Sequence, residues 1–187
     1  AATPVSIEVV LSDAHPSKDL QVAYRATGGT ATGSGTDYTL VPDTLTFPAG
    51  TTSGFINLSI HDDALDEFDE TVRVELVGTG SLNLNLGSDV VHTHTILDND
   101  DPPELQFAES GSSGAESFQT VNLVFELSAV SGKNITADYA VSGGTASAGA
   151  DYLLTPGTIT IPAGSLTRIV QFTIIDDTDE ESGENID

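Results

Sequence analysis

The sequence predicts an all-β protein of two tandem immunoglobulin-like antiparallel β-sandwiches, and three observations lead to that fold class. Apolar and polar residues alternate over short segments rich in Val, Ile, Thr and Phe, which is typical of strands with one face in a core and one in water. These segments are 6–11, 54–60, 71–77, 121–127 and 166–175. Between them stand turn signals at the spacing of a sandwich: Gly28-Gly29, Pro48-Ala-Gly50, Gly143-Gly144 and Pro162-Ala-Gly164.

The third observation is an internal repeat that covers almost the whole chain. Gly28-Gly-Thr-Ala31 recurs at 143–146, Asp37-Tyr38 recurs at 151–152, and the Pro-Ala-Gly turn at 48–50 recurs at 162–164. Each copy is long enough to bury one hydrophobic core. We therefore predict a first repeat at 1–100 that lacks its first strand and a second repeat at 101–187 that lacks its last strands. We also expect neighbouring repeats of the same polypeptide on either side.

Composition narrows the class of partner. Five Lys and Arg against 29 Asp and Glu give a net charge of −24, which disfavours nucleic acid and anionic membrane surfaces and suits cations. Cysteine is absent, so disulfides and thiolate metal sites are excluded. No apolar stretch approaches the roughly 20 residues of a membrane span, so no direct membrane insertion is expected. An export signal or anchor would lie outside this sequence.

Each copy places a cluster of acidic residues directly after the same predicted strand. Asp62, Asp63, Glu67 and Glu70 follow one strand, and the second copy repeats the cluster from Asp176 to Glu184. Crowded carboxylates repel one another unless a cation neutralises them, and Ca²⁺ prefers six to eight oxygen ligands. The spacing is not that of an EF-hand loop. The alternative is a set of solvated acidic loops in which Asp residues close turns.

The ordered motifs Gly-Gly-Thr-Ala, Asp-Tyr, Pro-Ala-Gly and the acidic cluster resemble the Calx-β domain family, known from sodium–calcium exchangers and many bacterial surface proteins. The resemblance covers nearly all of both repeats. It implies calcium ions at one end of each sandwich, held by the aspartate of Asp-Tyr, the acidic loop and an acidic triplet after the last strand. In the first repeat the implied ligands are Asp37, Asp62, Asp63, Leu65 through its carbonyl, Glu67, Glu70, Asp98, Asn99 and Asp100.

In the second repeat the resemblance implies Glu116, Asp151, Asp176, Asp177, Asp179 through its carbonyl, Glu181 and Glu184. The closing triplet of this repeat falls beyond Asp187, so we expect the first repeat to bind calcium better. Between the repeats, Pro102 and Pro103 predict a semi-rigid junction because proline fixes φ.

We expect no enzymatic activity, because the four histidines have no Ser or Cys partner in a recognisable nucleophile motif.

The leading hypothesis is a calcium-binding structural module of a large secreted or cell-surface bacterial adhesin or matrix protein, in which Ca²⁺ stiffens the sandwich ends and the junction. One alternative is a calcium-sensing regulatory domain pair of a membrane transporter. Another is an accessory domain of a large exoenzyme. The sequence does not identify a protein or glycan partner.

Overall fold

The computed structural model describes residues 2–78, 84–117, 120–176 and 183–187, which divide into two compact units. The first unit comprises Ala1–Ala64 and Phe68–Asp98, and the second comprises Leu65–Glu67 and Asn99–Asp187. Three residues of the acidic loop, Leu65–Glu67, therefore pack as part of the second unit. Among the described residues there is no helix with the length and hydrophobicity needed to cross a membrane.

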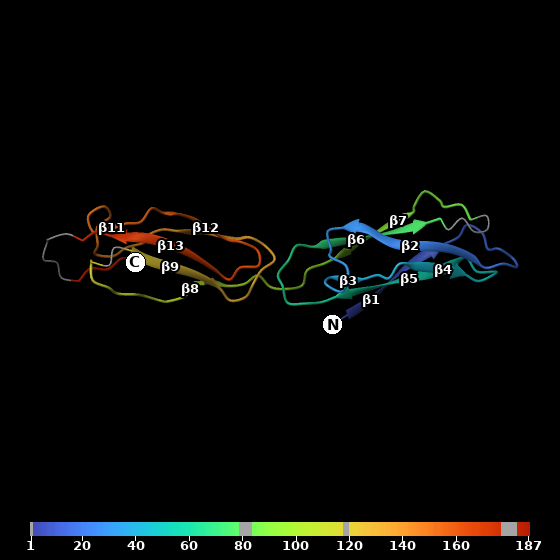
Figure 1. The fold of residues 1–187 in the computed structure, drawn as a ribbon, viewed down its shortest axis with the longest axis horizontal. Helices are drawn as coiled ribbons and strands as arrows, with labels where there is room; N and C mark the ends of the chain where they lie inside the picture. The colour runs from blue at the N-terminus through green and yellow to red at the C-terminus, as the bar shows by residue number, and fades with distance from the viewer. Residues whose placement is uncertain (1, 79–83, 118–119, 177–182) are drawn as a thin grey trace. The chain divides into compact units, whose positions relative to one another are not determined.

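Two antiparallel sheets make up the first unit (Figure 1). One sheet has the order β1-β5-β3 and the other β4-β2-β6-β7. The strands are β1 (Ala2–Val10), β2 (Leu20–Gly29), β3 (Tyr38–Thr39), β4 (Asp43–Phe47), β5 (Ser53–His61), β6 (Glu70–Val77) and β7 (Val91–Ile96). The predicted segments 6–11, 54–60 and 71–77 thus lie in β1, β5 and β6, and the predicted all-β sandwich class is confirmed.

Side-chain alternation builds the core of this unit. Ile56 and Leu58 point inward from β5, and Val72 and Val74 point inward from β6, all four being at most 2% exposed. Their neighbour Phe55 is 56% exposed, as expected from the two-residue period of a strand. Burying each branched side chain contributes about 1.5–3 kcal/mol, so the two sheets are held together mainly by these alternate positions.

The second unit also has two sheets, with the orders β11-β13-β9-β8 and β10-β12 (Figure 1). Its strands are β8 (Leu105–Phe107), β9 (Thr120–Leu127), β10 (Ile135–Tyr139), β11 (Tyr152–Leu153), β12 (Gly157–Ile161) and β13 (Thr167–Ile174). The predicted segments 121–127 and 166–175 lie in β9 and β13. Phe125, Leu127, Ile159 and Ile161 form its buried core.

Equivalent strands of the two units pair in the same register. Leu20 lies opposite Phe47 in β2–β4, and Ile135 lies opposite Ile161 in β10–β12. Since the same turn sequences flank both pairs, the sequence repeat corresponds to a repeat in three dimensions.

The Gly-Gly-Thr-Ala turn brings two backbones very close together. Gly29 has φ of +117°, and a Cβ atom built on it would lie 1.9 Å from the carbonyl oxygen of Thr71. Gly28 has φ of +137°, but nothing lies within 4 Å of its Cβ position. Gly29 is therefore required both for its backbone conformation and for the close approach of β6, whereas Gly28 is required for conformation alone.

Alanine substitutions should separate these two requirements. We expect Gly28→Ala to lower the free energy of unfolding by about 1–3 kcal/mol through φ strain. Gly29→Ala should cost clearly more, because the Thr71 backbone must also move away. Urea unfolding followed by circular dichroism measures both values. Equal losses of unfolding free energy in the two variants would show that the close approach of the Thr71 backbone to Gly29 does not add to the cost of the substitution.

Candidate metal centre

Asp37 is fixed in a tight loop before β3. Its Oδ2 accepts a hydrogen bond of 2.5 Å from the Thr32 amide, and its own amide donates to the Thr32 carbonyl at 3.0 Å. Its carbonyl oxygen accepts from the amide of His61, the last residue of β5, at 2.8 Å. These bonds hold Asp37 beside the start of the acidic loop, and they confirm that this residue closes a turn.

Glu70 is placed by the Gly-Gly-Thr-Ala turn. The Thr71 amide donates to Thr30 Oγ1 at 2.9 Å, and the Thr30 amide donates to Thr71 Oγ1 at 3.3 Å. The Ala31 amide also donates to the Thr71 carbonyl at 3.1 Å. Because Glu70 directly precedes Thr71 in β6, this set of bonds brings its backbone next to the loop that carries Asp37.

Asp37, Glu67 and Glu70 form a carboxylate group. Each offers one oxygen, these oxygens lie within 4.8 Å of one another, and each residue is half-buried. All three were predicted as calcium ligands. Carboxylate oxygens at this spacing, without nitrogen or sulfur donors, fit a hard cation such as Ca²⁺ rather than zinc. Partial burial increases the repulsion between the negative charges, so a bound cation would stabilise the arrangement.

The other predicted ligands of the first repeat are not part of this group. Asp62 and Asp63 are exposed just after β5, and Leu65 is half-buried. Asp98, Asn99 and Asp100 follow β7, with Asp98 and Asp100 half-buried and Asn99 exposed. Asp69, which was not predicted, accepts a hydrogen bond from the Asp98 amide at 3.0 Å and so fixes the start of this triplet. A ligand role for these six residues stays a prediction.

The second repeat builds an equivalent turn that is one residue shorter. Asp151 Oδ2 accepts from the Ser147 amide at 2.5 Å, and its carbonyl accepts from the Ile175 amide at 2.8 Å. Glu116, Asp176 and Glu184 are exposed. Asp177, Asp179 and Glu181 lie outside the described residues. In the part of this repeat that the structure describes, no three acidic or histidine side chains form a group comparable to that around Asp37.

Asp66, which the sequence did not single out, is a buried carboxylate inside the second unit. It is 3% exposed, and Lys133 Nζ and Ser131 Oγ donate to it at 2.5 and 2.7 Å. The hydrogen bond from Lys133, followed by that from Ser131, holds the pKa of the Asp66 carboxyl below its usual value. Gly132 lies next to the neighbouring Glu67, because a Cβ built on Gly132 would be 2.7 Å from Glu67 Cγ.

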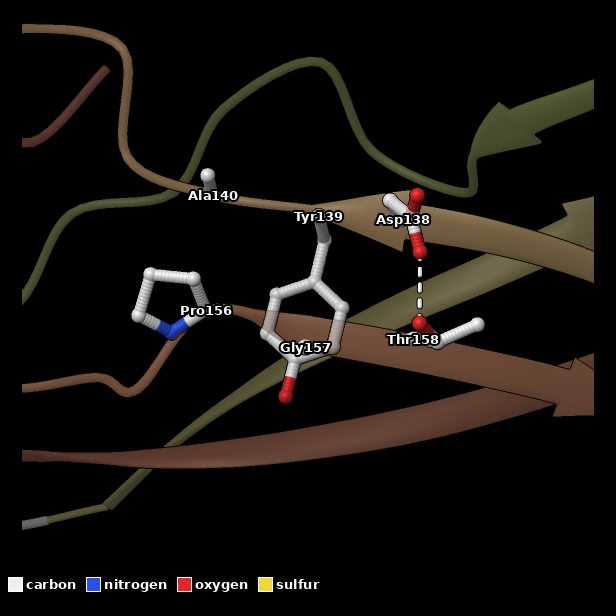
Figure 2. Close-up of a pocket in the computed structure, with 6 residues that line it drawn as sticks. All are labelled: Asp138, Tyr139, Ala140, Pro156, Gly157 and Thr158. Carbon is white, nitrogen blue, oxygen red and sulfur yellow. Dashed lines mark hydrogen bonds between the residues drawn. The ribbon is translucent and has the colours of Figure 1, made fainter.

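A separate hollow of about 390 Å³ lies where β10 ends and β12 begins. Figure 2 shows the Tyr139 ring over Gly157 and the hydrogen bond of 2.5 Å from Thr158 Oγ1 to Asp138. Among the residues that the structure describes, Asp138 is the only acidic one that lines this hollow. A cation site needs several converging oxygens, so we assign no metal to it.

Loss of the Lys133 charge should destabilise the chain, because it leaves the Asp66 carboxylate buried without its cation. We expect Lys133→Met to lower the melting temperature at pH 7. The difference from the unsubstituted protein should narrow as pH falls below about 4, where a carboxyl becomes protonated. Calorimetric melting at several pH values measures this.

Lys18→Met is the matched control for that variant. Lys18 precedes Asp19, whose Oδ1 accepts from the Ala49 amide, just as Lys133 precedes Asn134, whose Oδ1 accepts from the Ala163 amide. Lys18 is exposed, so its loss should change the melting temperature little. Equal effects of the two variants would contradict the role given to the Asp66–Lys133 pair.

Comparison with known proteins places these features in a family. The family model described as the Calx-beta domain matches residues 1–100 and again 98–186. The comparison with curated proteins gives no match. Among solved structures, CBD12 from CALX1.2 is 23% identical with a TM-score of 0.48, over 91% of this chain and 68% of that chain. The calcium binding domain CBD12 of CALX1.1 is also 23% identical with a TM-score of 0.48, over 93% and 70%. Since the family model matches twice and spans nearly all residues, the chain belongs to the Calx-beta domain family.

Proposed function

We propose that the chain is a calcium-binding tandem module and that Ca²⁺ binds in the first repeat at Asp37, Glu67 and Glu70. The observation that carries the proposal is the carboxylate group itself: three half-buried acids with ligand atoms within 4.8 Å of one another. Hydrogen bonds of the backbone hold Asp37 and the start of β6 in place. Holding ligand residues in place in this way lowers the conformational cost of binding.

Three carboxylates alone give too few oxygens for calcium, which takes six to eight. The further oxygens that we propose are the carboxylates of Asp62, Asp63, Asp98 and Asp100, the amide oxygen of Asn99, the carbonyl of Leu65, and water. Asp62 and Asp63 follow β5 and Leu65 lies in the same loop, whereas Asp98, Asn99 and Asp100 follow β7. The role of calcium is then to neutralise the acidic loop and stiffen it, together with the junction that follows β7.

The second repeat is proposed as the weaker site. It keeps the aspartate turn at Asp151, and Glu116, Asp176, Asp177, Asp179, Glu181 and Glu184 stay its predicted ligands. Glu116, Asp176 and Glu184 are exposed, and solvent screens exposed charges more strongly than half-buried ones.

Two biological contexts fit a non-catalytic calcium module. In the first, the chain is a structural part of a secreted or cell-surface bacterial protein whose partners are calcium and neighbouring repeats. In the second, it is a calcium-sensing domain pair that regulates a membrane transporter; the CALX1.1 protein is described as having calcium binding domains. Further repeats and an export signal in the full polypeptide would support the first context. Transmembrane helices would support the second.

Calcium should raise the melting temperature of the chain, because ligand binding to the folded state adds a stability of RT ln(1 + [L]/Kd). At a calcium concentration 100 times Kd, the gain is about 2.7 kcal/mol. Glu70→Gln should remove most of this increase. Glu109→Gln makes the same charge change at an exposed residue outside the group and should leave it intact. A melting temperature that does not change on addition of millimolar calcium would refute the proposed function.

Paired substitutions should locate the stronger site. Asp37 and Asp151 accept equivalent turn hydrogen bonds, each 2.5 Å long, so Asp37→Asn and Asp151→Asn should disturb their turns equally. Calorimetric titration should show calcium affinity falling at least about tenfold, or 1.4 kcal/mol, in the first variant. The second variant should retain the tighter binding event. A larger loss of calcium affinity in Asp151→Asn than in Asp37→Asn would place the stronger site in the second repeat instead.

A further inference from the structure

Two histidines of β7 stand at positions where the alternation of the sheet predicts apolar residues. Val72 and Val74 of the neighbouring strand β6 (Figure 1) belong to the core and are at most 2% exposed. In the β6–β7 register, His94 lies directly opposite Val72, and His92 lies directly opposite Val74. Residues directly opposite each other in an antiparallel pair share one face of the sheet. Both histidines therefore belong to the core-facing side of β7.

The other residues on this side of β7 follow the expected pattern. Val90, just before the strand, and Ile96, its last residue, are apolar and half-buried, and Ile96 packs against the core of the first unit. Between them, His94 is half-buried and His92 is exposed. The row thus carries polar side chains at two successive core-facing positions. Such departures from the binary pattern concentrate at functional sites.

The surroundings leave both imidazole rings available to a ligand. Within the part of the chain that the structure describes, neither ring has a hydrogen bond or an ion pair with another residue. The charged residues Arg73 and Glu75 of β6 lie on the other face of the sheet, because side chains alternate along a strand. The guanidinium of Arg73 is therefore directed away from the histidine side, where it would otherwise repel a cation.

The spacing of the two rings suits a transition-metal ion. A strand rises about 3.3 Å per residue, so the Cα atoms of His92 and His94 are about 6.6 Å apart and their side chains leave the strand in the same direction. Neutral imidazole binds Cu²⁺, Ni²⁺ and Zn²⁺ through nitrogen, whereas Ca²⁺ takes oxygen ligands. Among these ions, Cu²⁺ has the highest affinity for a given nitrogen site. The net charge of −24 also raises the local concentration of any cation.

We propose that His92 and His94 form a binding site for a divalent transition-metal ion, with Cu²⁺ as the tightest-binding ion. One nitrogen of each ring binds the metal, and water completes its coordination. The site is distinct from the proposed calcium site: Glu70 lies further along β6, opposite Ile96, and the carboxylate group that it forms with Asp37 and Glu67 contains no histidine.

Copper titration of the whole chain, in the presence of millimolar calcium, tests the proposal. Calcium competes for carboxylate oxygens but not for imidazole nitrogens. We expect one tightly bound Cu²⁺ per chain, whose electron paramagnetic resonance spectrum shows coupling to two imidazole nitrogens. His92→Gln and His94→Gln should each lower the copper affinity at least about tenfold, because losing even an outer partner of a metal ligand costs about 10–100-fold.

His15→Asn is the matched control. The Nδ1 atom of His15 accepts hydrogen bonds from the amides of Ser17 and Lys18 at 3.3 and 3.0 Å. An asparagine side chain can accept local bonds of this kind, so the variant removes an imidazole and keeps an acceptor for the turn. It should leave the copper affinity unchanged. If His94→Gln does not fold, the exposed His92 provides the test through His92→Gln.

Three outcomes would overturn the proposal. An equal loss of copper affinity in His92→Gln and His15→Asn would mean that copper binds to exposed histidines without a specific site. A spectrum with oxygen ligands alone would mean that carboxylates hold the ion. No copper binding would mean that His92 and His94 are solvated polar residues at the margin of the core. The nitrogen count and the histidine variants do not depend on whether calcium binds near Asp37, so the proposed calcium function is tested separately.

Discussion

The close backbone contact between the Gly-Gly-Thr-Ala turn and the start of β6 is the constraint on which the rest of the first unit depends. It requires a residue without Cβ at Gly29, and it is secured by the reciprocal bonds of Thr30 and Thr71. The contact sets the register of β6, which places Val72 and Val74 in the core. It also sets the position of Glu70, so one local feature determines both the packing and the candidate site.

Charge is distributed according to burial. The one buried carboxylate among the described core residues, Asp66, has Lys133 and Ser131 as partners, since an unpaired buried charge is costly. The half-buried group of Asp37, Glu67 and Glu70 combines three negative charges within 4.8 Å. A bound cation is the natural means of neutralising such a group, whereas the exposed acids can rely on solvent and salt.

Sequence periodicity was enough to predict the all-β class and five of the main strands, because alternation at residues such as Ile56 and Leu58 directly reflects a core. The three acids that the structure brings together were predicted from the repeated motifs and their resemblance to the Calx-β family, not from periodicity. The Asp66–Lys133 pair could not be predicted in this way. Its partners are 67 residues apart, and nothing in the local sequence distinguishes Asp66 from the exposed acids beside it. Whether the remaining predicted ligands bind an ion depends on loop geometry that periodicity does not determine.

The two repeats show how one sequence pattern gives the same local structure twice. Both keep the aspartate turn, the Gly-Gly turn and the register of the first strand pair. The close approach at the Gly-Gly turn also recurs, because a Cβ atom on Gly144 would lie 2.2 Å from the Asn185 carbonyl oxygen, as one on Gly29 would lie 1.9 Å from that of Thr71. Ile186 pairs with Gly144 as Val72 pairs with Gly29. The repeated motifs therefore determine turn geometry and strand register in both units, because each turn admits only one arrangement of the two backbones that it joins.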